Sequence, residues 1–582
     1  MAVAAGAAAW AAVTTIAGGF VIDILGAHVS SRDPARPIAA SLFLFIAARL
    51  VLGRDEFSRA TAAVVGGPGA RAARVALMAS LAVLVFSTAW NTRAAGGSDS
   101  SCYILQADAF AHGNIMLPHP LASTLPGAAP AVFAPIGFVP SRVPPFTAVP
   151  ICGAGLALTM TPLLALFGHG AVFLVVPMFA ALAVWLTFVI GRRIDDGVTG
   201  ASAAVLLATS PIFLYQAVQP MSDVPAAALW LAALALASRG DSRGDIAAGV
   251  CASLAVLTRP NIALLVVLLL FVLPGRVARA DAPKARRGAW RRFALAALPG
   301  LAAMAVLNAA RYGSAAASGY GSTDALFSLA HVAPNLARYP RWIVETETPF
   351  IALALAAPWW ASRHPARARL AMVSFAAIVL TTATYLAYTV FDDWWYIRFL
   401  LPAIPLAIVL AVAVVLDIAS RLLPTGKPVM AATLLCVVIG AWHVHVARSR
   451  HVLDLQALES RFRVTGRYVA RAMPGNAVFL AVQQSGSLRF HGARPTIAWD
   501  AIDPRALDRT IAWLSANGFR PFIALEDAEE PRFRARFSGE HFGALDWPPA
   551  AEVHAPVRVR LFDPVSRAGF AVGGGVNTEH IR

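Results

Sequence analysis

Two acidic residues of this sequence, Asp99 and Asp223, each lie directly beside a long apolar segment. Asp99 follows the apolar residues 75–92, and Asp223 separates residues 200–218 from residues 224–238. A carboxylate at the boundary of an apolar layer is costly unless it is hydrated, paired or functional. A functional carboxylate in such a place can accept a proton or stabilise a developing positive charge. Both residues are therefore candidate catalytic groups.

Each carboxylate also has a structural explanation. Ser98 or Asp99 can cap a helix that continues through Tyr103. Asp223 can close a turn or cap a helix ahead of Pro225. The residue types alone leave a catalytic role and a capping role open for both positions.

Two arginines occupy comparable positions near the ends of apolar segments. Arg259 stands in a Thr-Arg-Pro sequence, and Arg398 follows an aromatic run that contains Trp394 and Trp395. Because guanidinium groups form paired hydrogen bonds to phosphate, both arginines are candidate anion ligands. The alternative for Arg259 is a side chain that snorkels from a helix end. The alternative for the tryptophans is an aromatic belt at a membrane interface.

The composition indicates what must position these residues. The chain has 582 residues, of which 58% are hydrophobic and 14% charged, and its mean hydropathy is +0.64. Ordinary soluble domains carry about 25% charged residues. Uncharged apolar runs of membrane-spanning length recur from Ala7 to about Val446. These features exclude a soluble multidomain enzyme, a fibrous protein and a disordered chain, and they predict a polytopic membrane protein.

The apolar runs predict an all-α transmembrane bundle of about 11–13 helices. The Pro-containing segment 151–167 is expected to lie as a helix at the membrane surface, with a full crossing as the alternative. The expected spans cover residues 7–27, 37–52, 75–92, 170–190, 200–218, 224–238, 246–258, 261–273, 293–309, 349–361, 370–390, 399–418 and 429–446.

Positive charge is concentrated in short loops between these runs, although the net charge is +16. That distribution is typical of membrane topology rather than of nucleic-acid binding, so no nucleic-acid partner is expected. One set of alternate loops holds about twenty basic residues and the other about nine, which places the richer set and the N-terminus in the cytoplasm. Residues 93–150, 310–348 and the tail after 447 are then periplasmic. No Lys or Arg precedes the first apolar run, so it is expected to be a retained span.

The four cysteines show no metal-binding spacing. Cys251 and Cys436 lie inside apolar runs and are expected to be small core residues. Cys102 and Cys152 flank the large outer loop, where a disulfide is chemically permitted but not required.

The last part of the chain has a different pattern. After residue 447 the sequence is charged, and strand-like runs at 477–482 and 522–525 alternate with helical stretches around 452–472 and 504–517. This order predicts a small α/β domain with a partly parallel sheet. The expected domains are an N-terminal hairpin and linker (1–74), a transmembrane domain (75–446) and the extracytoplasmic α/β domain (447–582).

The order of these features resembles the GT-C superfamily of membrane glycosyltransferases, in the branch of the aminoarabinose transferases and the protein O-mannosyltransferases (glycosyltransferase family 39-like). In that branch the first outer loop carries an Asp, a following Tyr and a helical stretch. The matching residues here are Asp99, Tyr103, Ala107, Phe110 and Gly113. Ser100 stands where a second acidic residue often follows the first, which is a departure from the pattern.

The resemblance continues through later elements and covers roughly residues 75–445. The family has surface helices, a span that ends in a basic pair, a second acidic outer loop and a "TRP" element. These correspond here to residues 151–167, Arg192–Arg193, Asp223 and Thr258–Pro260. The long Pro-rich stretch 118–150 is a second departure, and it affects the alignment of the surface helices.

The resemblance implies transfer of a sugar from a polyprenyl-phosphate donor to an envelope glycan, lipid or protein on the outer face of the bacterial inner membrane. It implies catalytic roles for Asp99 and Asp223, with Asp99 as general base or as stabiliser of an oxocarbenium-like charge. Arg259 and Arg398 would bind the donor phosphate. A divalent cation beside the two carboxylates stays open, although no ligand set with metal spacing supports one.

Further residues are expected to contact substrate on the same resemblance. Tyr103, Glu345, Trp394 and Trp395 would bind donor or acceptor, the tryptophans by stacking on a sugar ring. Weaker candidates for the donor pocket are Glu347 and His119, whereas His331 is expected to make local loop contacts. Four residues of the tail are expected to shape a folded surface, with acceptor contact as the alternative: Gln483, Gln484, Arg489 and Trp499.

Two other classes of function fit a polytopic protein with large outer loops. One is a transporter or flippase for a lipid-linked glycan, a class that often has repeated halves and charges near the bilayer midplane. Here the charges lie at span ends instead. The other is a non-catalytic envelope-assembly protein, which would tolerate the loss of Asp99.

Overall fold

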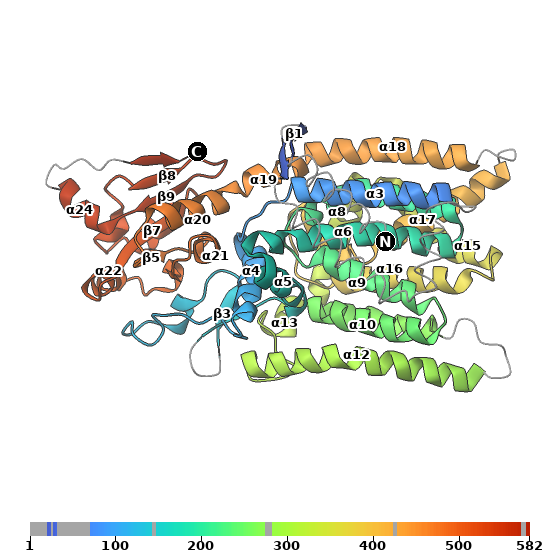
Figure 1. Ribbon diagram of the computed structural model, residues 1–582, viewed down its shortest axis with the longest axis horizontal. Helices are drawn as coiled ribbons and strands as arrows, with labels where there is room; N and C mark the ends of the chain where they lie inside the picture. Colours follow the sequence, from blue (N-terminus) through green and yellow to red (C-terminus); the bar gives the residue numbers. More distant parts are fainter. Residues whose placement is uncertain are drawn as a thin grey trace. The chain divides into compact units, whose positions relative to one another are not determined.

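The computed structural model describes residues 20–24, 27–31, 70–141, 147–273, 282–422, 428–571 and 578–581. The chain forms two compact units, each built from segments that are distant in the sequence. The described residues of unit 1 form helices and one short hairpin, whereas those of unit 2 combine helices with a six-stranded sheet (Figure 1). Unit 1 comprises Met1–Asn91, Phe173–Ala303 and Thr323–Leu453, and unit 2 comprises Thr92–Val172, Met304–Ser322 and Asp454–Arg582.

Six helices among the described residues are long and apolar enough to cross a membrane. Several carry apolar side chains that are more than half exposed, such as Leu295, Leu298, Leu434 and Val437. Lipid is the solvent that favours such a surface, so the chain is a multi-pass membrane protein, as expected. The six helical segments are Ala70–Ala89 (α3), His169–Ile194 (η2 and α6), Arg287–Tyr312 (within α12, Ala282–Tyr312), Ala368–Leu386 (α16), Ile404–Leu422 (α17) and Val429–Ser449 (within α18, Pro428–Ser449).

Other expected spans form shorter or bent helices. Residues 200–218 become α7 (Gly197–Thr209) and α8 (Pro211–Ala217), which meet at 63°. Pro211 accounts for the break, because proline cannot continue the hydrogen bonds of the preceding helix. The remaining short helices are α9 (Asp223–Ala237), α10 (Ser242–Thr258), the turns η3–α11–η4 (Pro260–Phe271), η6 (Pro349–Ala356) and α15 (Ala357–Arg363). Their crossing of the membrane stays a prediction.

The N-terminal span differs from its prediction. The apolar residues 7–27 predict a helix, but β1 (Phe20–Ile24) pairs antiparallel with β2 (Ala27–Ser31), so the helix prediction is wrong for residues 20–24. The β-branched residues of Phe20–Ile24 explain the difference, since they favour strands over helices. The other residues of this span and the expected span 37–52 lie outside the described residues.

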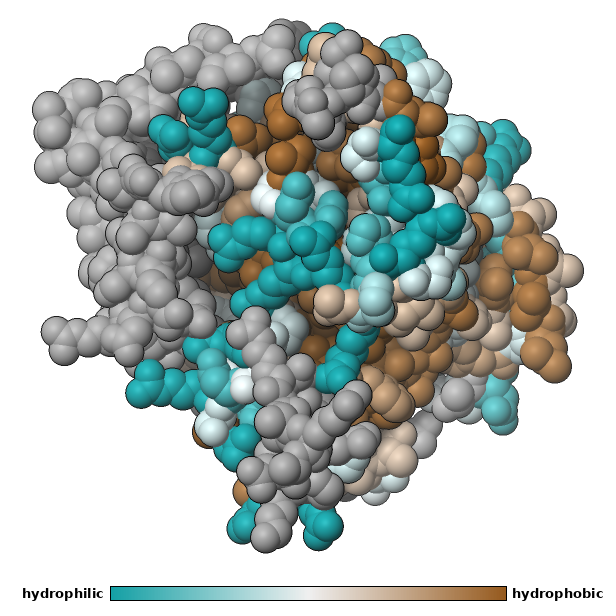
Figure 2. Space-filling view, turned by 90° about the vertical axis from the view of Figure 1, so that its right-hand side faces the viewer, coloured by the Kyte–Doolittle hydropathy of each residue, from teal (hydrophilic) through white to brown (hydrophobic). Residues whose placement is uncertain are grey.

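Arginines at several helix ends of unit 1 come together. Arg367 donates a hydrogen bond to Asp195, which directly follows α6 (2.6 Å). Arg363 and Arg421 both lie over the ring of Trp359, at 4.3 and 5.7 Å from its centroid. Figure 2 shows hydrophilic side chains gathered over this end of the helices, next to apolar ones. The three arginines belong to loops predicted to be cytoplasmic, so the structure brings these members of that set to one end of the helices, while the side of the membrane stays a prediction.

The sheet of unit 2 confirms the α/β character expected for the tail. Its strand order is β10-β8-β9-β7-β5-β6. Strand β5 pairs parallel with β6 and β7, and β10 pairs parallel with β8, whereas β9 pairs antiparallel with β7 and β8. The sheet is thus partly parallel, as predicted. The strands are β5 (Ala477–Leu480), β6 (Thr496–Ile497), β7 (Arg520–Glu526), β8 (Ala551–Val553), β9 (Val559–Phe562) and β10 (Glu579–Ile581).

The large loop 93–150 contributes to the core of this unit. Leu121, Leu125, Val132 and Phe133 pack in one apolar cluster with side chains of the sheet and of α22 (Leu507–Ala516). Unit 2 therefore includes segments outside residues 447–582. It also contains α4 (Gly97–Ala111), α5 (Ala154–Phe167), α20 (Ser460–Ala472) and α21 (Ser485–Phe490). Helix α5 confirms the helix expected over 151–167, and its position at the membrane surface stays a prediction.

Candidate functional site

Asp223 and Arg259 form a buried ion pair in unit 1. Asp223 opens α9, where Pro225 in the first turn favours a helix start, and its side chain is 1% exposed. Arg259 directly follows the last residue of α10, and its Nη1 lies 2.8 Å from Oδ1 of Asp223. Asp223 thus lies in the first turn of its helix, as a helix-capping role would require, and it also forms an ion pair. Arg259 does not snorkel into solvent, since its side chain is only 17% exposed.

Arg398 approaches the same carboxylate from a different part of the chain. It lies in η7 (Trp394–Leu400), with Nη1 4.0 Å from Oδ2 of Asp223 and 3.6 Å from Sδ of Met221. The guanidinium groups of Arg259 and Arg398 also lie 5.4 and 5.2 Å from the centroid of the Phe399 ring. Such cation–π contacts hold planar guanidinium groups in a fixed orientation. One carboxylate and one aromatic ring therefore organise two cations.

A small pocket adjoins this ion cluster. The rings of Tyr385 and Phe399 stack with centroids 5.1 Å apart, and Asn261 donates to the Tyr385 hydroxyl at 3.1 Å. Apart from Asn261, the pocket that Arg259 borders is lined by apolar or hydroxyl-bearing side chains, among them Ile262, Leu265, Thr381 and Tyr385. The arrangement combines an apolar lining with a cation at its edge.

The aromatic residues of η7 pack on unit 1 itself. The Tyr215 ring contacts Trp394 edge-on at 5.3 Å and stacks with Trp395 at 6.0 Å. Trp394 is buried, which argues against a purely interfacial belt for this residue. Arg450 lies 5.8 Å from the centroid of Trp394 and donates to Glu345 at 2.7 Å.

The two glutamates before residue 349 are held by other groups. Glu345 accepts hydrogen bonds from Arg341 (2.8 Å) and Arg450. Glu347, which ends α14 (Val332–Glu347), accepts from the Ser210 hydroxyl at the bend between α7 and α8 (2.5 Å) and lies 3.5 Å from Nε2 of His443. Their partners are Arg341, Arg450, Ser210 and His443, so a role of these glutamates in a donor pocket stays a prediction.

Asp99 lies in unit 2, in the first turn of α4. The cap position of this helix is Gly96, so neither Ser98 nor Asp99 is the N-cap residue. The Asp99 side chain is partly exposed, and Tyr103 one turn later is buried. A negative charge in the first turn of a helix is stabilised by the positive end of the helix dipole. The catalytic roles of Asp99 and Tyr103 stay predictions.

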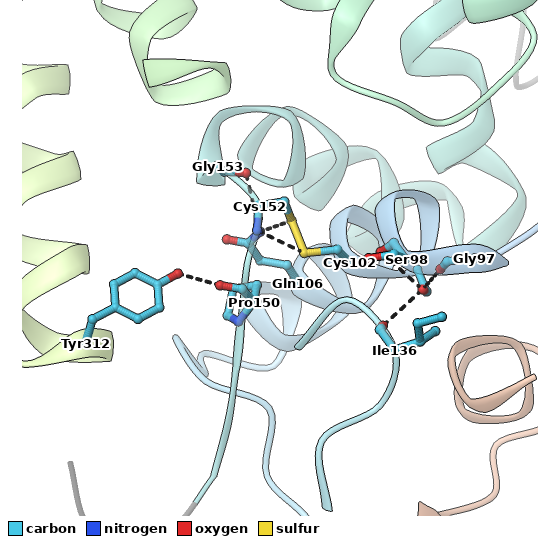
Figure 3. Close-up of a disulfide and its surroundings, with 10 residues drawn as sticks. Gly97, Ser98, Cys102, Gln106, Ile136, Pro150, Cys152, Gly153 and Tyr312 are labelled. Carbon is cyan, nitrogen blue, oxygen red and sulfur yellow. Dashed lines mark hydrogen bonds between the residues drawn. A yellow bond between two sulfur atoms is a disulfide. The ribbon is translucent and has the colours of Figure 1, made fainter. Parts of the chain in front are cut away.

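A disulfide anchors α4 to the start of α5. Cys102 and Cys152 are bonded to each other, which settles the question that the sequence left open (Figure 3). Gln106, one turn after Cys102, donates to the carbonyl of Gly153 at 3.4 Å. The segment just before Cys152 is held too, because Tyr312 donates to the carbonyl of Pro150. The helix that carries Asp99 is thereby fixed within unit 2.

His119 has a structural role rather than a free imidazole. Its Nδ1 accepts a hydrogen bond from the Leu121 backbone N–H (3.1 Å), and its Nε2 donates to the Thr496 carbonyl (2.9 Å). Burial, followed by the positive charge of Arg489, lowers the pKa of His119 to about 3. His119 is therefore a neutral link between the loop and the sheet. His331, with Nδ1 3.3 Å from the carbonyl of Ala387, makes the local contact expected of it.

The four candidates of the tail are largely engaged in folding. Gln484 donates to Glu526 at 2.8 Å, and the backbone N–H of Gln483 donates to Glu529 at 3.1 Å. Trp499 packs in the apolar cluster of unit 2. Burial lowers the pKa of Arg489 to about 10. Gln484 and Trp499 are thus buried inside unit 2 rather than on its surface, and acceptor contact by this group stays a prediction.

The sequence missed several residues that complete the ion cluster. Phe399, Tyr385, Met221 and Asn261 have no motif of their own, because their roles depend on contacts between segments far apart in the chain. The one usable signal was the position of Phe399 directly after Arg398. The donors at Asp223 are two guanidinium groups, and such neighbours disfavour a divalent cation at this carboxylate.

Comparisons with known proteins agree with this architecture. Residues 154–289 match the family described as dolichyl-phosphate-mannose-protein mannosyltransferase. The apo structure of ArnT from Cupriavidus metallidurans has 13% sequence identity and a TM-score of 0.52, over 90% of this chain and 98% of that chain. Its structure bound to undecaprenyl phosphate gives 14% identity and a TM-score of 0.51, over 84% and 97%. No match was found among the curated proteins.

A more distant similarity is to the oligosaccharyltransferase AglB from Archaeoglobus fulgidus, with 12% identity and a TM-score of 0.48 over 81% of this chain and 71% of that chain. At these identities the similarity to ArnT defines the fold. The chain therefore has an ArnT-like GT-C fold with a small sheet-containing part, which confirms the fold class expected from the sequence.

Proposed function

We propose that this protein transfers a sugar from a polyprenyl-phosphate donor to an acceptor of the cell envelope at the outer face of the inner membrane. The observation that carries the proposal is the buried cluster in which Asp223 lies between Arg259 and Arg398. Asp223 and Arg259 lie within residues 154–289, the range that matches a family model. The description of that family names a lipid-phosphate sugar, dolichyl-phosphate-mannose.

The donor phosphate fits the two guanidinium groups. Each guanidinium has five N–H donors in a plane. Asp223 offsets only one of the two positive charges of Arg259 and Arg398, so one positive charge is left to attract a phosphate. A phosphate that binds there gains charge-assisted hydrogen bonds from groups already oriented by Asp223 and Phe399. The same contacts stabilise the charge that develops on the phosphate as the glycosidic bond breaks.

The apolar side chains beside Arg259 offer a surface on which the first isoprene units of such a donor can pack, since the pocket between them, at about 20 Å³, holds no more than a water molecule. Its lining combines Ile262 and Leu265 with the ring of Tyr385. A lipid tail held there keeps the phosphate, and with it the anomeric carbon, at a defined depth. The donor is then oriented before an acceptor arrives, which lowers the entropic part of the barrier.

Asp99 is the proposed acceptor-side carboxylate, and Asp223 the second catalytic residue. As a general base Asp99 takes the proton of an acceptor hydroxyl while the oxygen attacks the anomeric carbon and the phosphate leaves. Tyr103, Glu345, Trp394 and Trp395 are proposed to contact the sugars. The acceptor is an envelope glycan, lipid or protein.

The test compares two buried aspartates. Asp223→Asn removes the charge that organises the arginines. Asp245→Asn is the matched control, because Asp245 is equally buried and accepts from Arg292 at 2.6 Å elsewhere in unit 1. A deletion strain that produces either variant or the wild type is analysed for polyprenyl-linked sugars by mass spectrometry of its lipid extract.

We expect one polyprenyl-phosphate sugar to accumulate in the deletion strain and with Asp223→Asn, but not with Asp245→Asn at equal protein level in the membrane. The absence of any accumulated lipid-linked sugar would refute the proposal. A transporter is distinguished by the side on which the lipid accumulates: membrane-impermeant periodate reaches the outer-leaflet substrate of a transferase but not the inner-leaflet substrate of a flippase. A non-catalytic assembly protein would function with Asn at position 99.

A further inference from the structure

The edge strand β10 and its neighbour β8 in the unit 2 sheet bring a glutamate and two histidines together. Strands β8 and β10 pair in parallel, and their register places His580 directly beside Glu552. Side chains two residues apart on an extended chain point to the same face, so His554, which follows β8, lies on the face of Glu552. The backbone fixes this register, because the His554 N–H donates to the carbonyl of Ile581 (2.8 Å).

The potential ligand atoms converge on one point. Nε2 of His554 and Nδ1 of His580 are 2.8 Å apart, and each lies 3.6 Å from Oε2 of Glu552. A zinc ion with ligands at 2.0–2.2 Å in tetrahedral geometry separates its ligand atoms by about 3.3 Å. The three separations bracket that value. Among the residues that the structure describes, this is the one group of three such side chains with metal-like spacing.

Surrounding charges hold the glutamate in a ligating orientation. Oε1 of Glu552 faces Arg558 Nη1 (2.9 Å) and Arg560 Nε (3.4 Å), which leaves Oε2 directed at the histidines. Both arginines also pair with Asp527, at 3.2 Å each. Hydrogen bonds of this kind orient a ligating carboxylate, and Asp527 offsets part of the arginines' positive charge, which by itself would disfavour a cation. The Glu552 carboxylate is largely buried, whereas the two imidazoles are exposed to solvent, so water can complete the coordination.

We propose that Glu552, His554 and His580 bind one Zn²⁺ or a similar divalent transition metal. Two imidazole nitrogens and one carboxylate oxygen are a ligand set typical of Zn²⁺, with water in the remaining position. The ion fastens β10, the edge strand near the C-terminus, to β8. In the sequence this site shows only as the Glu-x-His spacing at 552–554, and that spacing is not part of the usual Cys/His zinc motifs. The site is independent of the proposed sugar transfer.

The experiment uses the full-length protein in detergent, treated with a chelator and then dialysed against ZnCl₂ or CoCl₂. Bound metal is counted by mass spectrometry of the elements, and Co²⁺ coordination is followed by its visible absorption. Variants His554→Ala and His580→Ala remove one ligand each. His541→Ala is the matched control, since His541 is an exposed histidine of the same unit outside the cluster.

We expect one metal ion per chain in the wild type and in His541→Ala, and an affinity at least about tenfold weaker in the two ligand variants. Zinc should also raise the melting temperature of the wild type but not that of the ligand variants. Where an alanine variant does not fold, Glu552→Gln keeps the side-chain size and gives the same comparison. The proposal is overturned if the wild type retains no metal, or if the ligand variants bind metal as tightly as His541→Ala does. In either case the contact between His554 and His580 is a hydrogen bond and not part of a metal site.

Discussion

Arg259 and Arg398 place their guanidinium groups at 5.4 and 5.2 Å from the centroid of the same ring, that of Phe399, although Arg259 follows α10 and Arg398 lies in η7, far apart in the chain. Both also approach Asp223. A planar cation over a ring, with a carboxylate at its edge, has little freedom to rotate. This rigidity distinguishes the pair from arginines that merely end a membrane helix.

The first prediction concerns the geometry of these arginines. Arg259→Lys keeps a positive charge but loses the planar, paired donors, so the apparent KM for the lipid-linked donor should rise by about 10- to 100-fold, with a smaller change in kcat. Arg292→Lys is the control, because Arg292 makes a comparable pair with Asp245. The measurement is transfer by protein reconstituted in vesicles, with the accumulated lipid from the deletion strain as donor. An unchanged donor KM for Arg259→Lys would contradict phosphate binding by Arg259.

The second prediction separates chemistry from helix capping at Asp99. Asp99→Asn should lower kcat by about 10²- to 10⁴-fold, because an amide cannot accept the acceptor proton. Expression and melting temperature should change little, since the cap position of α4 is Gly96. Asp108→Asn, on the same helix, is the control. Turnover at the wild-type rate in Asp99→Asn would eliminate the general-base role.

The third prediction tests the disulfide. The denatured wild type should take up two alkyl groups without reductant, at Cys251 and Cys436, and four after reduction. The bond closes a separation of 50 residues, for which chain entropy alone gives about 4 kcal/mol of stabilisation. Cys102→Ser/Cys152→Ser should therefore melt at a lower temperature. Cys251→Ser, which keeps the bond, should melt near the wild-type temperature and still take up two more alkyl groups after reduction. Four adducts in the unreduced protein would contradict the bond.

The fourth prediction follows from His119. Its folded pKa of about 3 lies below the ordinary value of 6.5, because burial and then Arg489 disfavour the charged ring. The unfolded chain therefore binds more protons between these values, so stability is complete above pH 6.5 and falls as the pH drops towards 3. The loss approaches about 1.4 kcal/mol per pH unit from this residue.

His119→Gln removes this titration and keeps a donor for the Thr496 carbonyl. Its melting temperature should change less than that of the wild type between pH 7 and pH 5, as measured by scanning fluorimetry. His491, whose pKa burial lowers to about 4, contributes in the same direction in both proteins, so the difference between them isolates His119. Equal acid sensitivity of the two proteins would show that His119 is not the cause.

Much of the architecture follows from local sequence. Apolar runs predict helices such as α3, α16 and α17 because hydropathy and helix propensity act over a few neighbouring residues. The alternation of the tail predicts its partly parallel sheet for the same reason. The residues 20–24 were mistaken for helix because an apolar run does not distinguish a helix from a strand when β-branched residues dominate it.

The candidate site divides in the same way. Residue type and position near a helix end identified Asp223, Arg259 and Arg398 one at a time, but the sequence by itself did not show that they meet. The bond between Cys102 and Cys152 and the approach of His580 to Glu552 likewise arise from pairing between distant segments. Such contacts are set by how helices pack and strands register, and no local pattern encodes them. The sequence determined which groups were available; the tertiary structure decided which of them act together.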